Sequence, residues 1–206
     1  MKNVDFELEE KPAPPAKSEG VVYQAGIIPL FGYITAETIS PIADYIIRAN
    51  VVPELYVNFI TLIICSDGGE LAPTIALSDI IDGSSIPIST VGLGSVSSSG
   101  LMLLMSGHKG YRIVTPNTII MSHQFSAGFY GKQHELISQG KEHKILSENL
   151  IRFYKKHSKF KSEKKIQNIL LPATDVYLTP QEALNYGLCD RIEKFTKKNY
   201  SVCELE

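Results

Sequence analysis

The residues best suited to chemistry lie in a serine-rich segment, residues 94–100 (GSVSSSG), directly before an apolar run that starts at Leu101. Small residues between a strand and a helix let the backbone bend sharply, so that one hydroxyl is presented beside the free N–H groups of the helix N-terminus. Because a helix N-terminus favours negative charge, a serine here would have donors ready for an oxyanion. A simple helix cap in a serine-rich loop explains the run equally well, since the Gly-x-Ser-x-Gly spacing of hydrolase elbows is absent.

Among the five histidines, His123 is the best candidate for a general base. It ends an expected strand at residues 119–123, and α/β folds keep their sites at the C-terminal edges of strands. A structural histidine held by hydrogen bonds is the alternative. No two histidines have metal-ligand spacing with a carboxylate beside them, so we expect no catalytic metal and no cofactor. The remaining histidines fall in an expected turn or on a charged helical segment: His108, His134, His143 and His157.

A histidine base needs a carboxylate that fixes its tautomer, and Asp175 is a candidate for that role. It lies just before a short helix that residues 179–182 (TPQE) predict, with Thr as the N-cap and Pro at the first helical position. An isolated Asp more often caps its own turn, which is the alternative. Residues 65–70 (CSDGGE) leave a buried strand through two glycines, where a backbone can approach a ligand and direct its amides, although an ordinary turn has the same composition.

The elements that must position these residues alternate along the chain, which predicts an α/β domain with a largely parallel sheet covered by helices. A 25-residue amphipathic helix, Gln133–His157, is longer than such a core needs, so its apolar stripe is expected to bury either on another subunit or on its own core. The apolar runs predict strands at residues 27–33, 58–66, 86–92, 111–114 and 119–123. Helical patterns cover residues 39–47, 71–81, 97–106 and 133–157, and a short helix closes at Gly187.

Composition excludes several classes of protein. The chain has 206 residues, 44% hydrophobic and 20% charged, which suits one globular domain. With 20 basic and 22 acidic residues the net charge is −2, so we expect no nucleic-acid or membrane partner. Three cysteines without a CxxC pair predict a reducing compartment, and no signal peptide or membrane span is visible, which indicates a cytoplasmic protein. We expect a disordered arm at residues 1–25, one domain at 26–193 and a polar tail at 194–206.

Five segments, in order, make residues 26–193 resemble the ClpP family, the proteolytic subunits of the caseinolytic, ATP-dependent serine proteases. Residues 66–69 (SDGG) match the family's Ser-Pro-Gly-Gly, 94–100 its nucleophile segment Gly-Gln-Ala-Ala-Ser-Met-Gly, and 121–124 (MSHQ) its Met-Ile-His-Gln. Residues 128–131 (GFYG) match Gly-Tyr-x-Gly, and 174–190 match the stretch from Arg-Asp-x-Phe to Tyr-Gly-Leu-x-Asp. The resemblance implies a ClpP/crotonase-like α/β fold of repeated β-β-α units, from which the long helix protrudes as a handle.

The same resemblance implies a catalytic triad of Ser98, His123 and Asp175, with the backbone N–H groups of Gly69 and Ser99 as oxyanion hole. It implies a serine endopeptidase that hydrolyses unfolded polypeptides inside a homo-oligomer of heptameric rings, two of them stacked through the long helix. The resemblance also implies a hexameric AAA+ Clp ATPase as partner, and ATP would bind to that partner, since this chain has no Walker A loop of its own. The residues expected to bind substrate are Gly68, Glu70, Gln124 and Ser126.

The chain also departs from the ClpP pattern. Asp67 stands where the family has proline, Ser99 replaces the usual apolar residue after the nucleophile, and the N-terminal segment does not resemble the family's axial loop. Two alternatives therefore stay open. One is a catalytically silent ring subunit that scaffolds active partners, and the other is an acyl-CoA enzyme of the crotonase fold.

Overall fold

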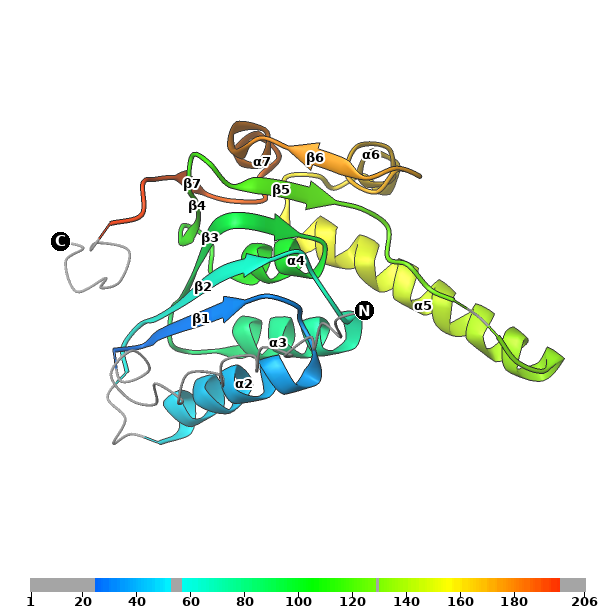
Figure 1. Ribbon diagram of the computed structural model, residues 1–206, viewed down its shortest axis with the longest axis horizontal. Coiled ribbons are helices and arrows are strands. Elements are labelled where there is room, and N and C mark those ends of the chain that lie inside the picture. The colour runs from blue at the N-terminus through cyan, green and yellow to red at the C-terminus, as the bar shows by residue number, and fades with distance from the viewer. Residues whose placement is uncertain (1–24, 53–56, 129, 197–206) are drawn as a thin grey trace, which may run out of the picture.

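A mostly parallel sheet of seven strands forms the centre of the structure, a computed structural model that describes residues 25–52, 57–128 and 130–196. Its main path runs β1-β2-β3-β4-β7, with β5 paired to β3 and β6 paired antiparallel to β5 (Figure 1). The α/β class expected from the alternating pattern is confirmed. The strands are β1 (Ile27–Phe31), β2 (Ile60–Ser66), β3 (Ile88–Ser97), β4 (Arg112–Val114), β5 (Ile119–Ser122), β6 (Val176–Leu178) and β7 (Arg191–Ile192).

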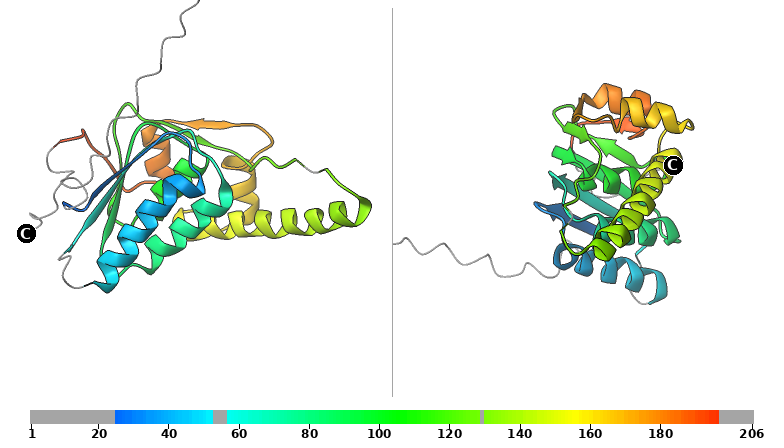
Figure 2. Two further views of the ribbon diagram at one scale, coloured as in Figure 1. Left: turned by 60° about the horizontal axis from the view of Figure 1, so that its bottom comes forward. Right: turned by 90° about the vertical axis from the view of Figure 1, so that its right-hand side faces the viewer.

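Three helices cover one face of this sheet. Because β1 to β4 are adjacent, parallel and in chain order, right-handed crossovers bring all the connecting helices to the same side. Figures 1 and 2 show this layer, and also show a fourth helix that projects away from it. The helices are α2 (Ala36–Val51), α3 (Leu71–Gly83), α4 (Ser99–Ser106), the projecting α5 (Gln133–His157), α6 (Glu163–Ile169) and α7 (Pro180–Tyr186).

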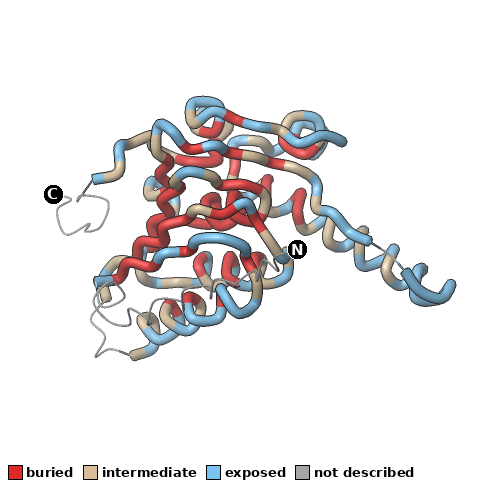
Figure 3. The backbone as a smooth tube through the Cα atoms, in the orientation of Figure 1, coloured by how far each residue is buried: buried red, intermediate tan, exposed pale blue. Residues whose placement is uncertain are grey.

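The core lies where the central strands meet α4. In β2 six of the seven residues are buried, as the continuous apolar run predicts for a strand covered on both faces. All eight residues of α4 are buried, and Figure 3 shows burial concentrated in this region. The expected apolar face of α2 is correct for Ile39, Ile42 and Ile46, whereas Ile47 is 48% exposed.

Strand β3 extends five residues beyond its predicted end at residue 92. The segment that we expected to form a loop is strand as far as Ser97, and that expectation was wrong. The reason is a change of partner: β3 pairs with β4 up to Gly92 and with β5 from Ser95 onward, across a register irregularity against β2. Gly94, at φ +61°, supplies the backbone conformation that this irregularity needs. The sharp turn therefore begins only at residue 98.

Helix α5 has the bounds predicted for it, Gln133–His157, but it buries little. Only Leu150, Ile151 and Tyr154 are buried, all near its C-terminal end. Its N-terminal part exposes Leu136 and Ile137. Within the described ranges, no helix combines the length and the apolar composition needed to cross a bilayer.

The remaining predictions concern the ends of the chain. Helix α7 is confirmed, with the Thr179 capping box and Gly187 in the left-handed conformation that closes it. Helix α6 and strands β6 and β7 were not predicted. Most of the arm and tail expected at residues 1–25 and 194–206 lies outside the described residues.

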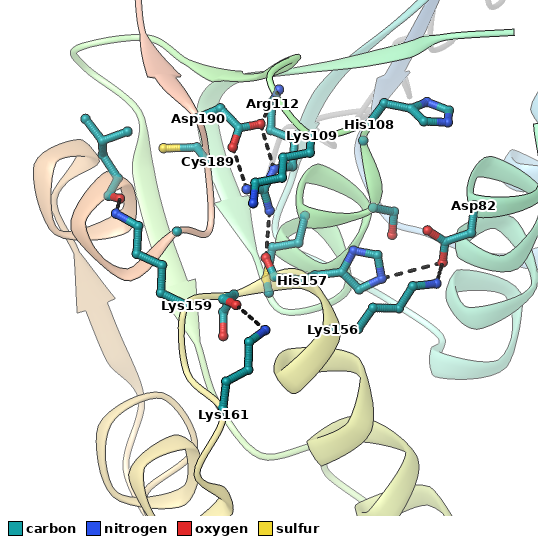
Figure 4. A pocket seen from close by; sticks show the side chains of 16 residues that line it. Asp82, His108, Lys109, Arg112, Lys156, His157, Lys159, Lys161, Cys189 and Asp190 are labelled. Carbon is teal, nitrogen blue, oxygen red and sulfur yellow. Dashed lines mark hydrogen bonds and ion pairs between the residues drawn. The ribbon is translucent and has the colours of Figure 1, made fainter.

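A buried ion pair joins β4 to the chain entering β7 (Figure 4). Arg112 donates from Nε and Nη2 to Asp190 at 2.9 and 2.6 Å, and from Nη1 to the carbonyl of His157, at the end of α5. The two side chains are only 7% and 14% exposed. Burial alone would raise the pKa of Asp190, but the hydrogen bonds and charge of Arg112 outweigh it and lower that pKa below its usual value.

Replacing Asp190 with Asn is therefore expected to lower the free energy of unfolding by about 3 kcal/mol at neutral pH, because it leaves a buried guanidinium uncompensated. The folded-state pKa is depressed, so the pair stabilises the fold above the unfolded carboxyl pKa of about 4, and this stability is lost as the pH falls through the lower folded pKa. Urea unfolding at several pH values measures both effects. Asp44→Asn is the matched control, since the Asp44–Arg48 pair is exposed and should contribute under about 1 kcal/mol. Equal losses for the two variants would contradict the assignment.

Candidate active site

Ser98 occupies the turn between β3 and α4. Its backbone lies at φ 54° and ψ −121°, and it is the sole residue other than glycine with a positive φ in the described part of the chain. Such a conformation is strained for an L-residue and persists only where its surroundings hold it in place. The Ser98 N–H donates to the carbonyl of Met121 on β5 at 2.9 Å, which ties the turn to the neighbouring strand.

Glycine is required at two positions of this region, because the backbone of residues 66–68 lies very close to that of residues 98–100. A Cβ atom on Gly68 would lie 2.7 Å from the Cβ of Ser98, and one on Gly100 would lie 2.8 Å from the carbonyl oxygen of Ser66. Ser66 itself orders the turn, because its Oγ donates to the carbonyl of Gly32 at 2.6 Å and accepts from the Gly68 N–H at 3.1 Å. The two glycine-bearing segments found in the sequence thus pack directly against each other.

His123 lies within hydrogen-bonding distance of Ser98. Its Nε2 is 2.7 Å from Ser98 Oγ, and its side chain is 26% exposed. Strand register explains this contact. Strands β3 and β5 are parallel with Ser97 opposite Met121, so the residues that follow each strand emerge at the same sheet edge.

Asp175 lies on the far side of the imidazole. Its Oδ1 is 3.5 Å from His123 Nδ1, which is an ion-pair distance rather than a short hydrogen bond, and its side chain is 54% exposed. The antiparallel pairing of Ser122 with Val176 sets Asp175 beside His123. The structure therefore brings together three side chains that lie 25 and 52 positions apart in the sequence.

Two backbone amides flank Ser98. Ser99 is the first residue of α4, so its N–H has no acceptor within the helix. Gly69 forms an isolated parallel bridge with Ile34, in which Ile34 bonds to the neighbours of Gly69 on either side. The N–H and the C=O of Gly69 itself therefore point away from Ile34. The Gly69 carbonyl accepts a hydrogen bond from Ser99 Oγ at 3.1 Å. Since the N–H and C=O of an extended residue point the same way, the Gly69 N–H is also on the Ser98 side.

A cavity of about 460 Å³ opens beside Ser98 and His123. Its wall is largely apolar and includes Met102, Phe125, Leu146 and Leu150. The carboxylates of Asp67 and Glu70 also line it. Tyr154 lies in the same wall, where its hydroxyl bonds Ser122 Oγ at 2.7 Å. Burial raises the pKa of Tyr154 to about 12, so this phenol stays neutral and is not suited to proton transfer.

The residues expected to bind substrate divide into two groups. Glu70 and Ser126 line the Ser98 cavity, and Gly68 packs directly behind Ser98. Gln124 does not line this cavity: its Nε2 donates to the carbonyl of Leu171 at 2.8 Å, so the side chain is turned toward the segment after α6. Its two neighbours in the sequence, His123 and Phe125, do line the cavity.

Sequence reasoning missed the role of several apolar wall residues. Leu146 and Leu150 were assigned only to the stripe of the long helix, and Met102 only to an apolar core helix. Their i, i+4 spacing on α5 shows that Leu146 and Leu150 share a face, but it carries no information about what that face encloses. Within the described chain, no group of three His, Cys, Asp or Glu side chains is arranged to hold a metal ion.

Comparison with known proteins shows that the chain is similar to Clp proteases. The family model described as Clp protease matches residues 20–195. The protein of Deinococcus radiodurans described as ATP-dependent Clp protease proteolytic subunit is 39% identical to this chain over 132 residues, which cover 64% of this chain and 63% of that protein. The chain thus aligns with slightly less than two thirds of the length of this relative.

Proposed function

The chain belongs to the Clp protease family, and we propose that it acts within that family as a serine endopeptidase. The observation that carries this proposal is the 2.7 Å distance between Ser98 Oγ and His123 Nε2. A serine hydroxyl is a weak nucleophile at its own pKa, so it needs an adjacent base, and this contact supplies one. The strained backbone of Ser98 and the amides beside it are further support.

In the proposed mechanism, Ser98 Oγ attacks the peptide carbonyl carbon while His123 Nε2 takes the hydroxyl proton. The N–H groups of Gly69 and Ser99 stabilise the oxyanion, each contributing about 3 kcal/mol. Asp175 orients the imidazole and stabilises its protonated form through Nδ1. His123 then protonates the leaving amine nitrogen as the C–N bond breaks. Water hydrolyses the resulting ester, returning one proton to Ser98 through His123.

We propose that the substrate is an unfolded polypeptide bound in extended form. Its backbone would pair with residues 68–70 on one side and residues 126–128 on the other, so that affinity comes largely from main-chain hydrogen bonds. Such pairing tolerates many side chains, which suits an enzyme that degrades whole proteins. The location of both segments beside Ser98 supports this arrangement.

We further propose that the protein works as stacked heptameric rings, in the cytoplasm, with a hexameric AAA+ Clp ATPase delivering substrates. Support for assembly comes from α5, whose exposed apolar side chains have no cover within the described part of one chain. These are Leu136, Ile137 and Ile145. Support for an ATPase partner is the relative described as the proteolytic subunit of an ATP-dependent protease.

A serine-directed fluorophosphonate tests the proposal. Treatment of the intact protein at neutral pH should give one adduct per chain, and fragmentation mass spectrometry should locate it on Ser98 rather than on the neighbouring Ser97 or Ser99. Heat-denatured protein is the control, because reactivity depends on the folded contact with His123. The absence of an adduct would favour a silent ring subunit, and binding of coenzyme A instead would favour the crotonase-fold alternative.

A further inference from the structure

The cavity beside Ser98 combines apolar walls with unopposed negative charge. Asp67 and Glu70 both line it, and both residues are exposed. Among the described residues, neither forms an ion pair. Apart from His123, no described lining residue can carry a positive charge. The described lining of the cavity therefore carries two acidic side chains and, apart from His123, no basic one.

The two carboxylates flank the backbone expected to hold the substrate. Asp67 directly precedes and Glu70 directly follows Gly68 and Gly69, and these two glycines lie against Ser98 and Ser99. Asp67 is also held in place, because Ser95 Oγ donates to its Oδ1. A neutral hydroxyl orients this carboxylate without cancelling its charge. The ClpP pattern has proline at this position, and proline carries no charge.

The apolar wall has the chemistry to contact the stem of a long side chain. Met102 and Leu150 are 4% and 7% exposed in a wall that also contains Phe125 and Leu146. Lysine and arginine bury their aliphatic stems along apolar surface while their charged heads reach a polar partner. A leucine or methionine would use the wall alone, and an acidic side chain would be repelled by the carboxylates.

We propose that this site prefers peptides with a lysine or arginine on one of the two residues that flank the scissile bond, with Asp67 and Glu70 as the specificity-determining residues. This inference rests on the proposed serine endopeptidase function. Hydrolysis at basic residues would be a preference and not a requirement, because main-chain pairing still holds peptides of other sequence.

The test compares fluorogenic peptides that differ only by lysine or norleucine at each flanking position, since norleucine keeps the stem and removes the charge. We expect kcat/KM to be about tenfold higher for the better lysine peptide, and this ratio to fall as salt screens the carboxylates. In the double variant Asp67→Asn, Glu70→Gln the ratio should fall to about 1. Asp79→Asn removes an exposed carboxylate on α3 that does not line this cavity, and it should leave the ratio unchanged.

The outcomes separate this inference from the function on which it rests. Equal kcat/KM for lysine and norleucine peptides, in a protein whose Ser98 accepts the fluorophosphonate, would overturn the preference and leave the peptidase intact. A preference that survives in the double variant would overturn the assignment to Asp67 and Glu70. Absence of both hydrolysis and labelling would overturn the peptidase and the preference together.

Discussion

Replacement of Ser98 by Ala is expected to lower kcat for peptide hydrolysis by a factor of about 10⁴ to 10⁶, and His123→Ala should have a similar effect. The reason is that the two side chains act as one unit: the hydroxyl has no base without the imidazole, and the imidazole has no proton to take without the hydroxyl. The double variant should consequently be no worse than either single one.

The measurement is turnover of a short fluorogenic peptide, which needs no ATPase to unfold it. Ser97→Ala is the matched control, because Ser97 precedes the nucleophile, is 5% exposed and lies opposite Met121 on β5 rather than against His123. It should keep activity within about tenfold of the parent. Particle mass in solution checks that each variant assembles like the parent. A Ser98→Ala protein with near-normal turnover would refute the triad.

Replacement of Gly69 by Ala should lower kcat by a factor of about 10² to 10³ even though no reacting side chain is changed. A Cβ atom there would overlap the backbone of Ile34, so the segment that carries the Gly69 N–H must shift. Loss of one oxyanion donor has an effect of this size in other hydrolases. KM should change less than kcat, because the oxyanion forms only after the substrate is bound.

Gly83→Ala is the control for Gly69, since Gly83 has open space around the added methyl group and lies at the end of α3. The melting temperature separates local misalignment from general unfolding. A Gly69→Ala protein that melts like the parent but has lost activity supports the oxyanion role. One that is stable and fully active would show that this amide is not used.

The sequence was most informative where a single periodic pattern decided the structure. The bounds of α5 follow from its uninterrupted amphipathic repeat, and the burial of β2 follows from its continuous apolar run. Helix α6 was missed because only Ile166 of its seven residues is buried, which leaves no period to detect. The predicted end of β3 was too early because glycine usually marks the end of a strand. Here Gly94 instead lets the strand bend and change its pairing partner.

The sequence indicated the reacting side chains of the site better than it indicated the residues that line the cavity. The sequence placed Ser98 between a strand and a helix and His123 at the end of a strand, and the parallel register of β3 and β5 brings the two side chains together. The catalytic role of Asp175 stays a prediction, although its carboxylate does face His123. The substrate-binding role expected of Gln124 stays a prediction, and its side chain bonds to the carbonyl of Leu171 instead of lining the cavity beside Ser98, because a motif fixes the order of residues but not where each side chain points.

Helix α5 has a consequence for where the stability of this chain comes from. It is 25 residues long, about 37 Å, yet none of residues 133–149 is buried. A helix without tertiary packing is marginal in water, and Leu146 and Leu150, near its anchored end, are the residues that line the cavity beside Ser98. In the proposed assembly, the free energy that keeps this outer segment helical would come largely from contacts with a second copy of the chain. By mass action, the helical order of the segment would then rise with protein concentration, and the shape of the cavity wall would depend on how many molecules are assembled.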